Sequence, residues 1–130
     1  MVCYNLREQQ ASIPLIDSIA EFVSSSGLYM VTIIGNPAVR IKLHEDLRSK
    51  RAQFANVIHP PTIVAEEVRL GVGVVLAPFP ILSVNSCIGA GVVINDYIFI
   101  QHDAQVGSCI YISGHYNVGD VLVLGQEAVV

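Results

Sequence analysis

The chain has 130 residues, which suits one compact domain or one domain with a small appendage. Apolar residues make up 52% of the chain and charged residues only 14%. Because so few charges cannot cover the surface of a small monomer, we expect apolar surface to be buried against another subunit. The net charge of −4 gives no basic surface for nucleic acid.

The cysteines and the hydrophobic segments indicate a reduced, soluble, cytoplasmic protein. Cys3, Cys87 and Cys109 are odd in number and form no C-x-x-C pair, so we expect free thiols. The first ten residues carry charges and amides where a signal peptide would be apolar. The longest apolar segment, residues 70–84, is interrupted by glycines and prolines and is too short for a membrane-spanning helix.

Residues 1–53 are predicted to form a small α/β region. Residues 13–25 have apolar side chains at helical spacing, and residues 28–35 are a β-branched run that ends in glycine, which is typical of a buried strand. A second helix is predicted after Asn36 as N-cap, with Pro37 at its first position. The apolar side chains of this helix are Val39, Ile41, Leu43 and Leu47, and His44 is expected on its exposed face. A new strand is predicted to begin at residue 54.

Residues 54–130 are predicted to form the second region, and from Ile58 onward the sequence follows a period of six. An aliphatic residue occupies every sixth position, at Ile58, Val64, Leu70, Leu76, Leu82, Ile88, Ile94, Ile100, Val106, Ile112, Val118, Leu124 and Val130. The residue after each aliphatic is small or polar in nearly every repeat, and the residue two places before is usually a second apolar side chain. A hexapeptide period predicts a parallel β-helix, a solenoid whose coils bury one another. An antiparallel sheet would explain the alternation but not the period.

Three hexads would make one triangular coil of 18 residues, with short strands hydrogen-bonded from coil to coil. We expect the aliphatic residue to fill the corner and the small residue beside it to make the turn. On this register His102 points outward from a flat wall, with Val84 and Asp120 beside it on the neighbouring coils. A solvated surface pair is one interpretation of His102–Asp103. A site for proton transfer is the other, because a carboxylate orients an imidazole and stabilises its cation.

The motifs I-G-N-x-x-x-R (residues 34–40), V-I-H-P (57–60) and H-D-x-x-V-G (102–107) add to the hexads. With them, about 100 residues resemble the hexapeptide-repeat acyltransferases with a left-handed parallel β-helix. The similarity is greatest to the sugar acetyltransferases related to sialic acid O-acetyltransferase and to the bacillosamine-pathway N-acetyltransferase. The resemblance implies a homotrimer that binds acetyl-CoA between adjacent prisms and transfers its acetyl group to a sugar or nucleotide-sugar.

The resemblance also implies roles for individual residues. His102 would be the general base and Asp103 would tune it. The candidate acetyl-CoA contacts are Tyr111, His115, Gly119 and Asp120. Asn36 and Arg40 are the candidate sugar contacts, at a helix N-terminus that faces a phosphate or that is only a strand–helix turn. His115 is either such a contact or a surface residue, and His59 is expected to be structural.

Three departures from the family pattern support an alternative. No glycine-rich turn precedes Ile13, Asp120 stands where the family usually has glycine, and Val130 falls in mid-coil. We therefore expect a chain shortened at both ends, and the alternative function is a catalytically weak or inactive trimeric scaffold or regulatory partner. A zinc site of the γ-class carbonic anhydrase kind is not expected, because only His102 and His115 lie on the outward β-helix wall.

Overall fold

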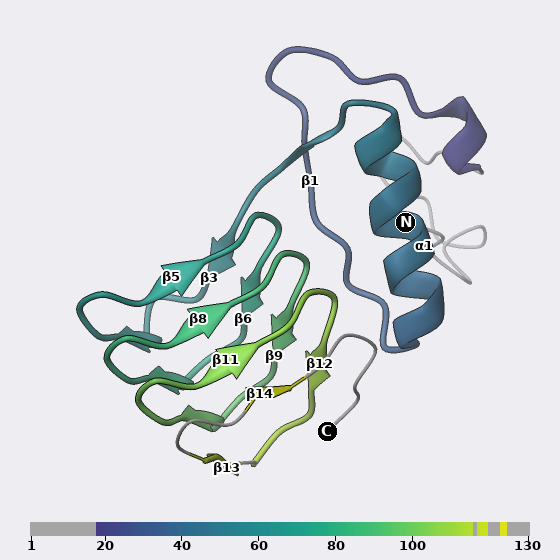
Figure 1. The fold of residues 1–130 in the computed structure, drawn as a ribbon. Helices are drawn as coiled ribbons and strands as arrows, with labels where there is room; N and C mark the ends of the chain where they lie inside the picture. The colour runs from purple at the N-terminus through teal and green to yellow at the C-terminus, as the bar shows by residue number, and fades with distance from the viewer. Residues whose placement is uncertain (1–17, 116, 120–122, 125–130) are drawn as a thin grey trace, which may run out of the picture.

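The structure is a computed structural model that describes residues 18–115, 117–119, 123 and 124. A stack of triangular coils forms one body, and the helix α1 stands beside it along the direction of stacking (Figure 1). This arrangement confirms the predicted mainly β fold with a small α/β region ahead of it. The solenoid begins at β3, a few residues after the position that the sequence indicated.

From Ile58 to Leu124 each hexad contributes one two-residue strand whose second member is the predicted aliphatic residue, whereas Val130 lies outside the described residues. The strands are β3 (Val57–Ile58), β4 (Ile63–Val64), β5 (Arg69–Leu70), β6 (Val75–Leu76), β7 (Ile81–Leu82), β8 (Cys87–Ile88), β9 (Val93–Ile94), β10 (Phe99–Ile100), β11 (Gln105–Val106), β12 (Tyr111–Ile112), β13 (Asn117–Val118) and β14 (Val123–Leu124).

The strands assemble into three parallel sheets, one for each side of the prism. Their orders are β3-β6-β9-β12, β4-β7-β10-β13 and β5-β8-β11-β14. Partners are 18 residues apart throughout, as in Val75 with Val93 and Phe99 with Ile81. The parallel pairing confirms the 18-residue coil and excludes the antiparallel alternative.

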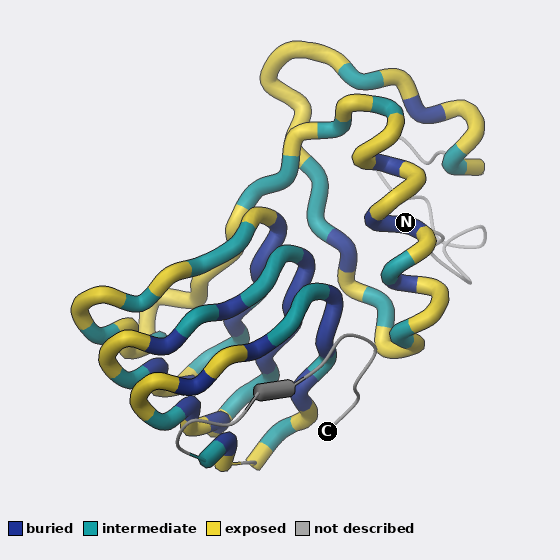
Figure 2. Tube along the Cα trace, viewed as in Figure 1, coloured by how far each residue is buried: buried dark blue, intermediate teal, exposed yellow. Residues whose placement is uncertain are grey.

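Two sets of side chains fill the interior of the prism: the aliphatic residue of each hexad and the apolar residue two places before it. Their buried members are Val74, Leu76, Leu82, Ile88, Val92, Ile94, Ile98, Ile100, Ala104, Val106, Ile110, Ile112 and Val118. Figure 2 shows the burial alternating along each coil, with exposed turns and a buried inner face. Burying one such Val, Leu or Ile side chain contributes about 1.5–3 kcal/mol, so the repeat itself supplies the stability.

The turns lie later in the hexad than the sequence predicted. The backbone turns at the second and third residues after each aliphatic, and the third residue has a positive φ in every hexad from Glu67 to His115. The residue directly after the aliphatic is small for another reason: a Cβ on Gly89 would lie 2.6 Å from the carbonyl carbon of Gly107, one coil away. The prediction that this small residue makes the turn is therefore wrong; it permits close stacking of coils.

The 18-residue coil produces three corners, which we name by the residues that stack along them. The aromatic corner carries Phe79, Tyr97 and His115. The histidine corner carries Asn85, His102 and Asp103. The helix corner carries Gly73, Gly91 and Cys109, and α1 packs against it.

The α/β region contains η2 (Ile19–Glu21), β1 (Tyr29–Met30), α1 (Pro37–Ser49) and β2 (Gln53–Phe54). The predicted cap of α1 is confirmed, since the Asn36 side chain accepts a hydrogen bond from the Val39 N–H at 3.1 Å and Pro37 begins the helix. The 13–25 helix is reduced to the 3-10 turn η2 within the part described. The 28–35 strand is reduced to β1, which pairs in parallel with β2.

The buried stripe of α1 differs from the predicted one. Its buried residues are Arg40, Leu43, His44 and Leu47, whereas Val39 is exposed. The prediction that His44 lies on the exposed face is wrong, because α1 rests on the glycines of the helix corner and His44 fills the space that they leave. Within the described residues, no helix is long and apolar enough to cross a membrane.

Candidate functional site

The candidate base lies in the turn of the histidine corner. His102 Nδ1 and Asp103 Oδ2 are 2.8 Å apart, and the two side chains are 54% and 48% exposed. A carboxylate can only accept, so Nδ1 carries the proton in this pair and the neutral ring has its lone pair on Nε2. The sequence predicted an outward His102 on a flat wall; the side chain is outward, but it lies at a corner. The left-handed φ of 58° at Asp103 turns the backbone there.

Asn85 completes this group from the preceding coil. Its Nδ2 donates to Asp103 Oδ1 at 2.8 Å, so each carboxylate oxygen has a different partner. The backbone fastens the same two turns together, since the Asp103 N–H donates to the Val84 carbonyl at 3.2 Å. The hydrogen bonds from His102 and then from Asn85 lower the pKa of the Asp103 carboxyl, because both favour its charged form.

Sequence reasoning missed Asn85 as a member of the site. The 18-residue coil places Val84 beside His102, as predicted, and by the same step it places Asn85 beside Asp103. Subtracting 18 from the position of the acid, as well as from that of the histidine, would have found it.

An exposed apolar surface adjoins the histidine corner. The outward residues of the β4-β7-β10 side are Ile63, Ile81 and Phe99, and all three are exposed. This side runs from the aromatic corner to the histidine corner. We call these three residues the apolar side; together with the aromatic corner it is the kind of uncovered patch that the low charge content predicted.

The aromatic corner is a ladder of stacked rings. The centroids of Phe79 and Tyr97 are 5.2 Å apart, and those of Tyr97 and His115 are 5.1 Å apart. Each ring sits on a residue of positive φ, one coil from the next. His115 is therefore one rung of this ladder and lies at a different corner from His102.

Arg40 connects the α/β region to the solenoid. Its guanidinium is fully buried and donates from Nη1 to the Ile34 carbonyl and from Nη2 and Nε to the Cys109 carbonyl. The guanidinium carbon lies 5.6 Å from the centre of the Tyr111 ring, and the Tyr111 hydroxyl accepts from Asn95 Nδ2 at 2.9 Å. These contacts give Arg40 a structural role, in which its charge is turned away from solvent and toward backbone oxygens.

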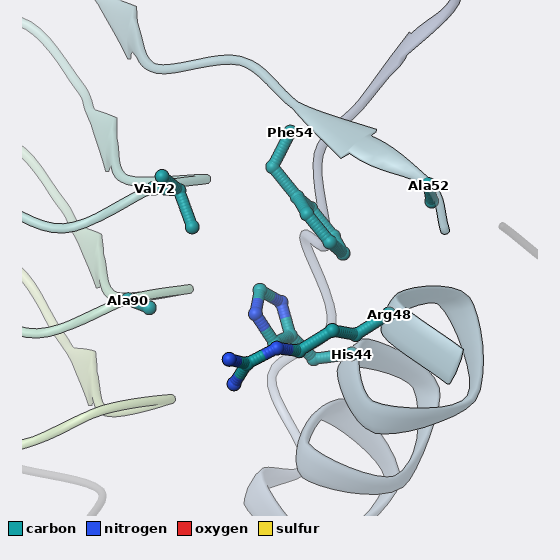
Figure 3. A pocket seen from close by; sticks show the side chains of 6 residues that line it. All are labelled: His44, Arg48, Ala52, Phe54, Val72 and Ala90. Atoms are coloured by element: carbon teal, nitrogen blue, oxygen red, sulfur yellow. The ribbon is translucent and has the colours of Figure 1, made fainter. Parts of the chain in front are cut away.

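A cavity of about 340 Å³ lies between α1, β2 and the helix corner, lined by His44, Arg48, Ala52, Phe54, Val72 and Ala90 (Figure 3). The His44 ring stacks on Phe54 with centroids 4.2 Å apart. Burial, and then the charge of Arg48, lower the pKa of His44, so it is neutral near pH 7. This cavity belongs to the contact between the two regions and not to the histidine corner.

The structure thus brings some predicted site residues together and keeps others apart. His102 pairs with Asp103, and Gly119 follows β13, one coil after Gln101 and close to His102 in register. Arg40 contacts Tyr111 on the side of α1, and His115 lies at the aromatic corner. Asn36 caps α1, and Asp120 lies outside the described residues.

No group of three or more His, Cys, Asp or Glu side chains in the described part of the chain is arranged to hold a metal ion. Of the cysteines, Cys87 and Cys109 are free thiols, and burial raises the pKa of Cys109. Cys3 lies outside the described residues.

Comparison with known proteins agrees with this architecture. No protein-family model matches the chain. The chain is 25% identical to GDP-perosamine N-acetyltransferase of Escherichia coli O157:H7 in an alignment 108 residues long, which covers 78% of this chain and 49% of that protein. The chain therefore spans about half the length of this curated relative.

A solved acetyltransferase domain shares the fold. The acetyltransferase domain of PglB from Neisseria gonorrhoeae FA1090 matches with a TM-score of 0.53 and 18% identity, over 86% of this chain and 66% of that one. A mutant of perosamine N-acetyltransferase from Caulobacter crescentus, crystallised with CoA and GDP-perosamine, matches with a TM-score of 0.47 and 21% identity, over 75% and 58% of the two chains. The predicted resemblance to hexapeptide-repeat sugar acetyltransferases and the left-handed β-helix are confirmed.

Proposed function

We propose that this chain takes part in the acetyl-CoA-dependent transfer of an acetyl group to an amino or hydroxyl group of a sugar or nucleotide-sugar, with His102 as general base. The observation that carries the proposal is the 2.8 Å contact between His102 Nδ1 and Asp103 Oδ2 at an outward corner of the solenoid. The GDP-perosamine N-acetyltransferase that the chain resembles, and the relative crystallised with CoA and GDP-perosamine, point to the same donor and acceptor classes.

The chemistry follows from the state of the imidazole. Asp103 holds the proton on Nδ1, so Nε2 can take the proton of an acceptor amine or hydroxyl as that atom attacks the thioester carbonyl. The tetrahedral intermediate then collapses, the C–S bond breaks, and the sulfur leaves as the thiolate of CoA, which is protonated to the thiol. The negative charge on the oxygen of the intermediate needs a hydrogen-bond donor. A backbone N–H near Gly119 is the candidate, on the coil next to Gln101.

A homotrimer would bring the separated site residues together. In one copy, His102 and Asp103 lie at the histidine corner whereas His115 lies at the aromatic corner, so a cleft between two copies is needed to combine them. The apolar side is exposed in one copy and borders the histidine corner. We propose that it is covered by a neighbouring subunit of a cytoplasmic trimer, which would also remove water from around His102 and strengthen its electrostatic contacts.

The test measures release of the CoA thiol from acetyl-CoA in the presence of a panel of amino sugars and nucleotide-sugars. Wild type is expected to turn over at least one acceptor, and His102→Ala to lose about a hundredfold or more of the rate, as is typical when a general base is removed. His59→Ala is the matched control, because His59 is also exposed in a turn region of the solenoid but lies away from the histidine corner.

Two results would decide against the proposal. Equal rates for wild type and His102→Ala would exclude His102 as the base. If calorimetry also gives no saturable binding of acetyl-CoA to the wild type, the alternative of a non-catalytic trimeric scaffold is the better account.

A further inference from the structure

The Asp103 carboxylate is held by two side chains from two coils. His102 precedes it in its own turn, and Asn85 occupies the same turn position one coil earlier. Both side-chain contacts are 2.8 Å long, and each uses one carboxylate oxygen. With both oxygens engaged, rotation of the carboxylate about its Cβ–Cγ bond would break both hydrogen bonds.

We propose that Asn85 is a positioning residue for His102, which fixes the Asp103 carboxylate and thereby the tautomer and direction of the imidazole. This inference rests on the proposed function of His102. It adds a third member to the pair, one that touches neither substrate nor the reacting atoms. In this arrangement the Asn85 amide holds the Asp103 carboxylate, and the carboxylate in turn holds Nδ1–H of His102.

The turn alone does not account for this contact. Asn85 has a φ of 63°, and asparagine is among the residues that adopt the left-handed region most readily. Glu67 and Tyr97 adopt the same conformation at equivalent positions, with φ of 62° and 55°, so the turn accepts other side chains. The backbone conformation therefore permits asparagine at position 85 but does not require it. The hydrogen bond that the Asn85 amide donates to Asp103 is a separate property of this side chain.

An amide is also suited to this place by its charge. A cationic donor would pair with the carboxylate and weaken its hold on the imidazolium that forms during proton transfer, whereas a neutral N–H orients the carboxylate and leaves its charge in place. The charged groups nearest in register are Glu66 and Glu67 on the coil before Asn85; Asp120 lies outside the described residues. A second carboxylate at position 85 would lie next to the Asp103 carboxylate, and its negative charge would favour the protonated form of the His102 imidazole over the neutral form.

Two substitutions separate the amide from the turn. Asn85→Asp keeps the shape and the turn preference but removes the donor and adds a charge. Asn85→Gly removes the side chain and is fully compatible with a positive φ. Glu67→Gly is the matched control, because it also replaces a residue of positive φ with glycine. Glu67 lies at the same corner of the prism, one coil further from Asp103.

We expect Asn85→Gly to lower kcat about tenfold with the KM for acetyl-CoA unchanged, the scale of one hydrogen bond to a charged group. Asn85→Asp should also lower kcat, and should move the acidic limb of the rate–pH profile to higher pH by about one pH unit, because a like charge near the pair favours the protonated imidazole. Glu67→Gly should stay within about twofold of wild type on the same hydrogen-bond scale. The charge that Asn85→Asp introduces would move the pH profile by itself, so the readout that a merely structural role for Asn85 would not move is the ring tautomer of His102 in Asn85→Gly, which adds no charge.

A second readout does not require turnover. Nitrogen NMR of the His102 ring reports which nitrogen carries the proton, and we expect Nδ1–H in the wild type and a mixture of tautomers in Asn85→Gly. Unchanged tautomer and unchanged rates in both Asn85 variants would overturn the inference. If the wild type itself turns over no sugar, the proposed function fails, and the NMR titration still decides on Asn85. If Asn85→Gly does not fold, Asn85→Asp alone carries the test.

Discussion

Arg40→Met tests how the α/β region is fastened to the solenoid. Methionine keeps an unbranched apolar side chain but removes the guanidinium that donates to the Ile34 and Cys109 carbonyls. Each buried carbonyl that loses its donor costs about 1–3 kcal/mol, or about 2–6 kcal/mol for the two. Burial also lowers the pKa of Arg40, so removing the buried charge recovers part of this, and we expect a net loss of about 2–4 kcal/mol.

The measurement is urea unfolding followed by circular dichroism, together with hydrogen exchange of backbone amides. Because Arg40 joins two regions, the amides of α1 should exchange faster in the variant, while those of β9 inside the solenoid should keep their protection. Arg48→Met is the matched control: it lies on the same helix with an exposed side chain, and it should change stability by less than about 0.5 kcal/mol.

An Arg40→Met protein that is as stable as Arg48→Met, with unchanged exchange in α1, would refute this reasoning. It would mean that the buried carbonyls find other donors, or that the charge costs as much to bury as its hydrogen bonds return.

Three further predictions concern the stacking of the coils, the Asp103 carboxylate and the apolar side. Gly89→Ala should destabilise the solenoid by about 1–3 kcal/mol in urea unfolding, because its Cβ would meet the backbone of the next coil at 2.6 Å, whereas Gly35→Ala has nothing within 4 Å and should be close to neutral. The lowered pKa of Asp103 stabilises the folded protein above the pH at which a carboxyl group usually titrates, and this stability is lost as pH falls through the lowered pKa. The free energies of unfolding of wild type and Asp103→Asn should therefore converge in acid, and a constant difference down to the lowest pH would contradict this. Phe99→Asp should lower the mass seen by sedimentation because it charges the proposed subunit contact, while Gln105→Asp, exposed on β11 in a different side of the prism, should not; equal masses for both would argue against the apolar side as the interface.

The sequence by itself determined the solenoid, because each coil is buried by the next and the burial pattern repeats every six residues. The aliphatic positions, the second inward column and the 18-residue register are all properties of that period. The cap of α1 is equally local, since Asn36 and Pro37 act on the first turn of their own helix. The His102–Asp103 pair was also readable as a candidate site, because an outward histidine next to an acid stands out in so apolar a run.

Only the tertiary structure decided where the turns lie and what α1 packs against. Asp103 and His115 adopt the left-handed turn without being glycine, so no local signal marks it, and the coil above fixes it through hydrogen bonds such as that from the Asp103 N–H. Gly73 and Gly91 have no side chains to cover the helix corner, so α1 packs closely against it. Arg40 and His44 are therefore buried, although the hydrophobic pattern of the helix alone places them at its surface. Contacts between coils and between regions depend on residues far apart in the chain, and these contacts join the histidine to its positioning group.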